Sequence, residues 1–109
     1  MRQAAVYRNN ELAGYLTEES RWRYVFRYDD NWFADARKPA ISLTLPKSQL
    51  VYESDGLFPF FVNLLSEGVN RRLQSTQLRI DENDSFGLLL ATAQYDTIGA
   101  ITLRPLPTS

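Results

Sequence analysis

The chain has 109 residues, of which 12 are basic and 13 acidic, giving a net charge of −1. This balance argues against DNA binding driven by overall charge, which needs an excess of Lys and Arg. Histidine and cysteine are both absent, so the chain lacks the commonest general base, the commonest metal ligand and any disulfide framework. We therefore expect no cofactor and no catalytic residue. An apolar share of 44% predicts one domain, residues 1–109, with its own core.

The first elements are two β-prone runs around Asn9-Asn10. Residues 3–8 and 11–17 are expected to pair as a hairpin, because Asn tolerates the positive φ of tight turns. The next turn is expected near residues 18–20, before a strand over 21–28. Side chains alternate faces in a strand. One face of this strand would carry Trp22, Tyr24, Phe26 and Tyr28, and the other Arg21, Arg23, Val25 and Arg27.

The middle of the chain predicts a turn or short helix, a strand and a loop. The turn or helix passes through Trp32 and Phe33 after a polar break. Residues 41–45 read Ile-Ser-Leu-Thr-Leu between two prolines and predict another alternating strand. Residues 47–56 are expected to form a loop that leads to a helix start at 54–56.

Helical spacing begins at Phe58, since apolar residues recur at 58, 61, 62 and 65. Pro59 is tolerated in the first turn, where its missing N–H has no partner to lose, and Gly68 suits the end of the helix. This segment is apolar nearly all round, so it must be buried on more than one side. It is either the central core helix or a helix with one flank left for another protein.

A second helix is predicted over about 69–78 and a third after the potential N-caps at 81–85. The apolar face of the third helix would comprise Phe86, Leu89, Leu90 and Ala93. A last strand is expected over residues 99–103. Strands followed by helices and a final strand predict an α+β fold. In it a small antiparallel sheet of N-terminal hairpins and the C-terminal strand packs with about three helices.

The strand at 21–28 offers the best case for nucleic-acid binding, because aromatic rings can stack on bases while Arg residues hold phosphates. The alternation, however, puts the two kinds of side chain on opposite faces. We favour an aromatic core face beneath a solvated face of Arg21, Arg23 and Arg27. Direct nucleic-acid binding through that Arg face remains the alternative.

Metal, phosphate and membrane sites receive little support from the sequence. The acidic groups, Asp29, Asp30 and Asp35 and then Asp81, Glu82 and Asp84, lack the ligand spacing of a calcium loop and fit helix caps and turns. The five glycines form no phosphate-binding loop. The longest apolar stretch, residues 57–65, is far shorter than the ~20 residues that span a bilayer, and the N-terminus lacks a signal peptide. We expect a cytoplasmic protein.

Five stretches in order resemble the N-terminal subdomain of HipA-type proteins and together cover about Val6 to Leu103. They are VYRNNELAGYLT, YVFRYDDNWFA, PAISLTLP, LFPFFVNLLSEG and DSFGLLLATAQYDTIGAITL. HipA proteins are bacterial serine/threonine kinase toxins of toxin–antitoxin systems, in which this subdomain precedes a much longer kinase region. The resemblance therefore implies the accessory fold without the kinase chemistry.

In split, three-component relatives, the missing subdomain is a separate small protein, HipS, which binds the short kinase HipT and acts as an antitoxin alongside the DNA-binding HipB. This chain is similar to that small partner in length and extent. The resemblance implies an antitoxin-like protein that binds a HipT-like kinase in trans and inhibits it. It also implies contact with a HipB-like protein through the complex. The alternative is an N-terminal accessory fragment of a full-length HipA.

Two turns depart from the family pattern. The family often has Leu-Pro-Glu-Gly after the Phe-rich helix and Gly-Arg-Asp before the last strand. Turns tend to carry partner contacts. We therefore expect partner binding at the corresponding residues of this chain, which are Ser66, Glu67, Gly68, Val69, Tyr95 and Asp96. The alternative for residues 66–69 is an ordinary helix cap.

Overall fold

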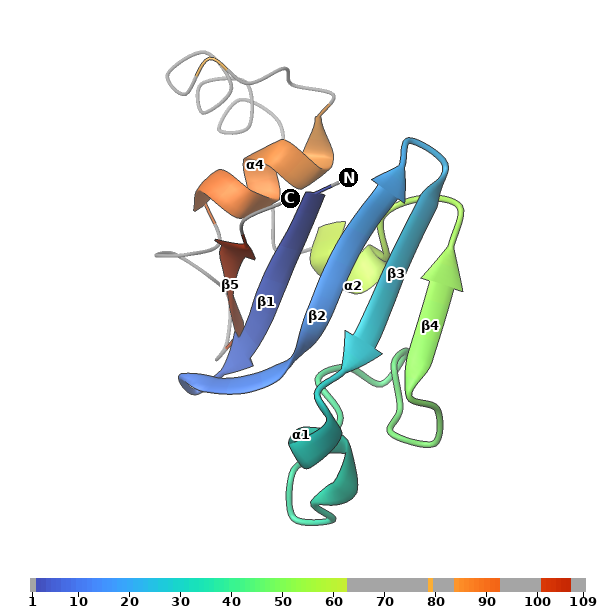
Figure 1. Ribbon diagram of the computed structural model, residues 1–109, viewed down its shortest axis with the longest axis vertical. Coiled ribbons are helices and arrows are strands. Elements are labelled where there is room, and N and C mark those ends of the chain that lie inside the picture. The colour runs from blue at the N-terminus through green and yellow to red at the C-terminus, as the bar shows by residue number, and fades with distance from the viewer. Residues whose placement is uncertain (1, 63–78, 80–83, 93–100, 107–109) are drawn as a thin grey trace.

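The computed structural model describes residues 2–62, 79, 84–92 and 101–106, which form a five-stranded antiparallel sheet with three short helices (Figure 1). The strands are β1 (Arg2–Arg8), β2 (Glu11–Ser20), β3 (Arg23–Tyr28), β4 (Val51–Ser54) and β5 (Ile101–Leu106). The helices are α1 (Asp30–Ala34), α2 (Pro59–Val62) and α4 (Ser85–Thr92). The strand order is β4-β3-β2-β1-β5. The predicted α+β class is confirmed.

The N-terminal hairpin forms as predicted around Asn9 and Asn10, whose φ angles are 51° and 67°. The next turn lies later than expected, because β2 continues to Ser20. Glu18 can stay in the strand because its carboxylate accepts hydrogen bonds from Arg2 and Tyr24. A polar residue whose partners come from neighbouring strands does not end a strand.

One face of the sheet packs against α2 and α4, and we call it the covered face. Phe26 lies at its centre, with ring centroids 4.9 Å from Tyr28 and 5.8 Å from Phe61 of α2. Tyr24 contacts Phe86 of α4 at 6.2 Å between ring centroids. The predicted aromatic core face of β3 is thus confirmed for Tyr24, Phe26 and Tyr28, all of which are buried.

Trp22 does not belong to that core, and its prediction was wrong. The residue precedes β3, in the turn after β2, and its exposed fraction is 73%. The alternation predicted from residue 21 fails at its start, because residues 21 and 22 form the turn and the strand begins at Arg23. Pairing of β2 with β3 begins only at Ser20 and Arg23.

The predicted strand at 41–45 is also wrong, because the segment turns back on itself. The Leu45 N–H donates to the carbonyl of Ser42 at 3.1 Å. Ile41 and Leu45 are buried while Leu43 is 99% exposed, whereas a strand would have placed all three on one face. The Tyr28 hydroxyl donates to the Leu45 carbonyl and accepts from the Ile41 N–H. This segment therefore satisfies its backbone without a partner strand.

Strand β4 lies within the segment that was predicted as a loop. It pairs with β3 in the register Tyr24↔Ser54 to Arg27↔Val51 and forms one edge of the sheet. Tyr52 packs against the core from this strand. A four-residue strand with a single large apolar side chain on the covered face gives too short an alternation to detect.

Helices are present after Phe58 and after residues 81–85, as predicted, but the predicted helix start at 54–56 is wrong, because Ser54 ends β4 and α2 begins at Pro59. Pro59 opens α2, and Phe58 and Phe61 are buried. Helix α4 corresponds to the predicted third helix, and Phe86 and Leu89 of its predicted apolar face are buried. Leu90 of that face is only partly buried, and Leu88, which the prediction did not include, is fully buried. The last strand is present but runs over 101–106 instead of 99–103, at the opposite edge of the sheet from β4. An edge position is where a strand tolerates a proline such as Pro105. The predicted helix at 69–78, Leu65, Gly68 and Ala93 lie outside the described residues.

Candidate functional site

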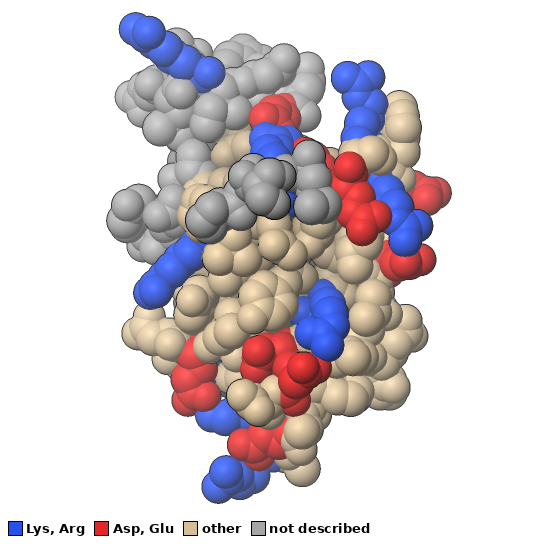
Figure 2. All heavy atoms as spheres, viewed as in Figure 1, with Lys and Arg blue, Asp and Glu red and all other residues tan. Residues whose placement is uncertain are grey.

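The sheet face opposite α2 and α4 presents two rows of neighbouring side chains, and we call it the open face. The first row comprises Leu106, Gln3, Thr17, Val25 and Glu53. The second row comprises Arg104, Ala5, Tyr15, Arg27 and Val51. Tyr7 and Thr102 pair beyond the second row. Figure 2 looks onto this face and shows uncharged atoms over much of it, with a basic group near the centre of the view beside acidic groups and further charged groups toward the ends.

The middle of the open face is uncharged and half-buried. Tyr15, Thr17 and Val25 are each partly exposed, and Ala5 between them is buried. The Gln3 side-chain amide donates to the Thr17 hydroxyl at 3.1 Å, which links β1 to β2 across the surface. A solvated face of an antiparallel sheet usually carries polar and charged residues. This one instead offers flat apolar and hydroxyl groups to whatever approaches it.

Two cations flank this uncharged middle. Arg27 donates to the Asp30 carboxylate at 2.7 Å. The Arg104 guanidinium lies 4.5 Å from the centre of the Tyr7 ring, a distance at which the ring face attracts a cation. In the part of the chain that the structure describes, Arg104 has no carboxylate partner. Its charge is therefore available to an acidic group from outside.

The three arginines of the proposed nucleic-acid face do not form one cationic patch. Arg23 lies between Glu19 at 2.6 Å and Glu53 at 2.5 Å. The hydrogen bond from Arg23 to Glu19 and the two nearby carboxylates raise the pKa of Arg23. Arg27 is paired with Asp30, so two of the three charges are already neutralised by acidic neighbours. Phosphate binding depends on cations without such neighbours.

The β2–β3 turn exposes an aromatic side chain at the end of the sheet. Trp22 and Leu43 are the large apolar residues that are strongly exposed among those the structure describes. The Trp22 N–H donates to the Ser20 hydroxyl at 3.3 Å, which closes the turn around it. A single exposed apolar residue is ordinary on protein surfaces, so neither residue defines a site alone.

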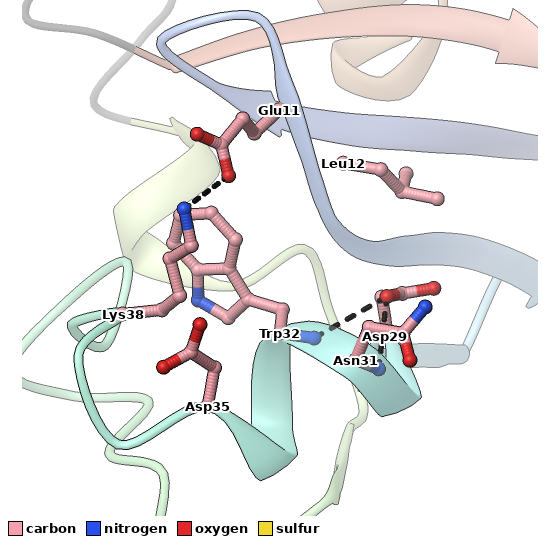
Figure 3. A pocket seen from close by; sticks show the side chains of 7 residues that line it. All are labelled: Glu11, Leu12, Asp29, Asn31, Trp32, Asp35 and Lys38. Atoms are coloured by element: carbon pink, nitrogen blue, oxygen red, sulfur yellow. Dashed lines mark hydrogen bonds and ion pairs between the residues drawn. The ribbon is translucent and has the colours of Figure 1, made fainter.

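A hollow of about 370 Å³ lies between α1 and the first hairpin (Figure 3). It is lined by Glu11, Leu12, Asp29, Asn31, Trp32, Asp35 and Lys38. Lys38 forms an ion pair with Glu11, and its ammonium lies 5.4 Å from the centre of the Trp32 ring. The Trp32 indole N–H donates to the Pro39 carbonyl at 3.0 Å. The ion pair joins the first hairpin to the loop that follows α1, and the indole hydrogen bond joins α1 to the same loop.

The acidic residues considered as metal ligands have structural partners here. Asp29 is the N-cap of α1 and accepts from the N–H groups of Asn31 and Trp32. Hydrogen bonds from Arg37 lower the pKa of Asp35. Within the described ranges, no three His, Cys, Asp or Glu residues come together in a group that could hold a metal ion. Asp81 and Glu82 lie outside those ranges.

A half-buried ionic cluster fastens α4 to the covered face. Arg2 of β1 donates to both oxygens of Asp84, at 3.0 and 2.8 Å, and to Glu18 at 2.8 Å. Asp84 also accepts from the Gly87 N–H at 3.0 Å, which confirms that one of residues 81–85 caps this helix. Hydrogen bonding to Arg2 lowers the pKa of Asp84 and raises that of Arg2. Burial, with a hydrogen bond to Glu18, raises the pKa of Tyr24 to about 12.

The predicted partner-binding residues, Ser66, Glu67, Gly68, Val69, Tyr95 and Asp96, all lie outside the described residues. Sequence reasoning did not single out Tyr7, Tyr15 or Arg104, which the sheet brings onto one face. The alternation of β1 and β2 was the available signal, since Tyr15 lies between Gly14 and Leu16 of the covered face. Arg104 lies beside Ala5 because β1 pairs with β5. The local sequence contains no signal that predicts this pairing.

Among the described residues, no helix is long and apolar enough to cross a membrane. A family model described as the HipA N-terminal domain matches residues 4–104. A protein of Haemophilus influenzae, described as uncharacterized, is 32% identical over 104 residues, which cover 95% of this chain and 92% of that protein. A solved structure described as the N-terminal domain of HipA toxin has a TM-score of 0.74 and 29% identity, with coverage of 100% of this chain and 96% of that one.

Proposed function

Because the chain belongs to the HipA N-terminal domain family, we propose that it binds a HipT-like serine/threonine kinase in trans and inhibits it, as an antitoxin. The observation that carries the proposal is the coverage of the Haemophilus influenzae relative. This chain matches 92% of that protein, so the relative contains little besides this domain. A family member without an attached kinase region supports a role exercised on a separate kinase.

In this proposal the chain contributes binding and no chemistry of its own. The cluster of Arg2, Glu18 and Asp84 holds a helix, and the carboxylates around α1 cap that helix or pair with basic side chains. The open face, by contrast, has an uncharged centre of the kind found in protein interfaces. A domain built in this way acts by covering a surface of another molecule.

We assign inhibition to the residues for which the sequence predicts partner binding. We propose that residues 66–69, together with Tyr95 and Asp96, contact the kinase and block substrate entry or hold its lobes apart. Exchange of residues 66–69 for a Gly-Ser sequence of equal length should then abolish inhibition while binding persists. Full inhibition by that variant would remove these residues from the mechanism.

The test is co-expression of this chain with a HipT-like kinase. We expect the two proteins to co-purify and the chain to relieve the growth arrest that the kinase causes. A catalytically inactive kinase is the matched control, because it should still co-purify but cause no arrest. A kinase that neither binds the chain nor is relieved by it would contradict the proposal.

A second candidate function is supported by the match to the N-terminal domain of HipA toxin. In that case the domain would be an accessory part of a kinase encoded in the same reading frame. The DNA sequence downstream of this domain distinguishes the two functions. A kinase region in the same reading frame supports the accessory role, and a kinase in a separate short reading frame supports the antitoxin role. A HipB-like DNA-binding protein would join either complex through the kinase. We expect the purified chain alone not to retard DNA in a gel, even at low salt.

A further inference from the structure

The open face has the composition of a recognition surface. Its middle presents the partly exposed side chains of Tyr15 and Val25, and the partly exposed Tyr7 and the exposed Arg104 lie toward β5. Tyr and Arg are enriched at the centres of protein interfaces, where Lys and Glu are depleted. Here Lys is absent from both rows, and Glu53 is at the outer edge and already paired with Arg23.

We propose that the open face docks on the kinase, and that the kinase surface it meets is apolar with a carboxylate opposite Arg104. This inference rests on the function proposed above and identifies the surface that carries it. Tyr15 and Val25 supply the flat apolar contact. Arg104, held over the Tyr7 ring at 4.5 Å, supplies a preoriented cation that the partner's carboxylate completes.

The charges of the open face argue against a second copy of this chain as its occupant. A symmetric dimer would bring two identical faces together, each with Arg27 and Arg104. The carboxylates nearest to this surface are already engaged, since Glu53 and Glu19 pair with Arg23, and Asp30 pairs with Arg27. In the described part of the chain, the open face therefore holds no free carboxylate to offer Arg104 of a copy. A different protein with its own acidic group fits better.

Footprinting of the complex tests the assignment in one sample. Hydroxyl radicals oxidise exposed aromatic and aliphatic side chains. With the HipT-like kinase bound, we expect Tyr7 and Tyr15 to lose at least half of their reactivity. Leu43, which is 99% exposed on the loop that follows α1, should keep its reactivity and serves as the internal control. Unchanged reactivity of both tyrosines in the complex would overturn the assignment.

Substitutions give an independent measurement of the same contact. Tyr15→Ala and Arg104→Glu should each weaken kinase binding by roughly tenfold or more, the range of interface anchors. Leu43→Ser is the matched control and should stay within about twofold. Circular dichroism and urea denaturation verify that each variant is folded before binding is measured. Added salt should lower the affinity of the unmodified chain more steeply than that of Arg104→Glu. The reason is that salt screens the ion pair between Arg104 and the kinase, which the variant does not form.

The outcomes separate this inference from the function on which it rests. If the unmodified chain does not bind the kinase, the proposed function fails and the docking assignment fails with it. If the unmodified chain binds while Tyr15→Ala and Arg104→Glu bind equally well, only the assignment fails. Self-association that the same two variants abolish would replace the kinase by a second copy as the occupant.

Discussion

The two faces of the sheet are built from the same strands but differ in what they pack against. On β3, Phe26 points to the covered face and is fully buried between Tyr28 and Phe61. Its neighbour Val25 points to the open face and is half-buried beside Thr17. One face thus provides most of the apolar burial that stabilises the domain, and the other remains available for recognition. Stability and binding should therefore respond to different residues of one strand.

The ionic groups of the two faces differ in the same way. Arg2 connects β1 to α4 and is held by two carboxylates at the margin of the core. Arg23 also contacts two carboxylates, but all three side chains of that cluster are at least 41% exposed. Similar geometry in different surroundings should give different contributions to stability, because solvent screens the exposed pairs.

Phe26→Ala should give the largest effect and separates the two faces most clearly. Removal of a fully buried Phe costs about 3–5 kcal/mol through lost burial and the cavity left behind. Val25→Ala on the opposite face should cost less than about 1 kcal/mol. Urea denaturation followed by tryptophan fluorescence measures both variants. Equal destabilisation by the two substitutions would mean that the open face is also part of the core.

Much of this division could be predicted from the sequence. The alternation of Tyr24, Phe26 and Tyr28 identified the buried face of β3. Helical spacing from Phe58 and the potential N-caps before residue 86 predicted the helices that the structure shows as α2 and α4. These predictions depend on local periodicity, which the chain carries within a few residues. The α+β class followed from the same local signals.

The errors came from features that depend on distant residues. Ile41 and Leu45 alternate as in a strand, but the Tyr28 hydroxyl supplies hydrogen bonds that let the segment turn instead. The sequence predicts a turn at Glu18, whereas the structure keeps Glu18 in β2, where it accepts from Arg2, a residue 16 positions away. Arg104 joins the open face only through the pairing of the first and last strands. A short window of sequence contains none of these contacts.

Gly14→Ala should give the next largest effect and tests how tightly the covered face is packed. A Cβ at position 14 would lie 2.5 Å from the Arg27 carbonyl oxygen and 2.8 Å from the Phe26 ring. The neighbouring strand would have to shift, at a cost of about 1–3 kcal/mol. Gly56→Ala is the matched control, because a Cβ there meets nothing within 4 Å. A stability for Gly14→Ala equal to that of the control would show that the sheet adjusts freely.

Asp84→Asn should destabilise the domain by about 1 kcal/mol at neutral pH, since a charge-assisted hydrogen bond is lost. The effect should depend on pH in a defined direction. The folded state lowers the pKa of Asp84 below its ordinary value of 3.8, so the unfolded chain binds the proton more readily. The stabilisation is therefore complete above about pH 5 and is lost as the pH falls through 4 and below.

Denaturation curves at pH 7, 5 and 3 measure this dependence for the unmodified chain and for Asp84→Asn. The difference in unfolding free energy between them should shrink toward pH 3. Other carboxylates titrate in both proteins and cancel in the comparison. A difference that stays constant from pH 7 to pH 3 would mean that the Asp84 charge contributes nothing and that only its cap to Gly87 matters.

Arg23→Gln should give the smallest effect, although its two ion pairs are as short as those of Arg2. Its guanidinium and both carboxylates are solvated, and pairs of this kind contribute little once side-chain entropy is counted. We expect no measurable shift of the urea midpoint, in low salt or in 1 M NaCl. Arg2→Gln, measured in parallel, should lower the midpoint because Asp84 and Glu18 then lose a partner at the edge of the core. If Arg23→Gln lowered the midpoint as far as Arg2→Gln does, the open face would contribute to the stability of the fold. The claim that this face serves recognition alone would then be wrong.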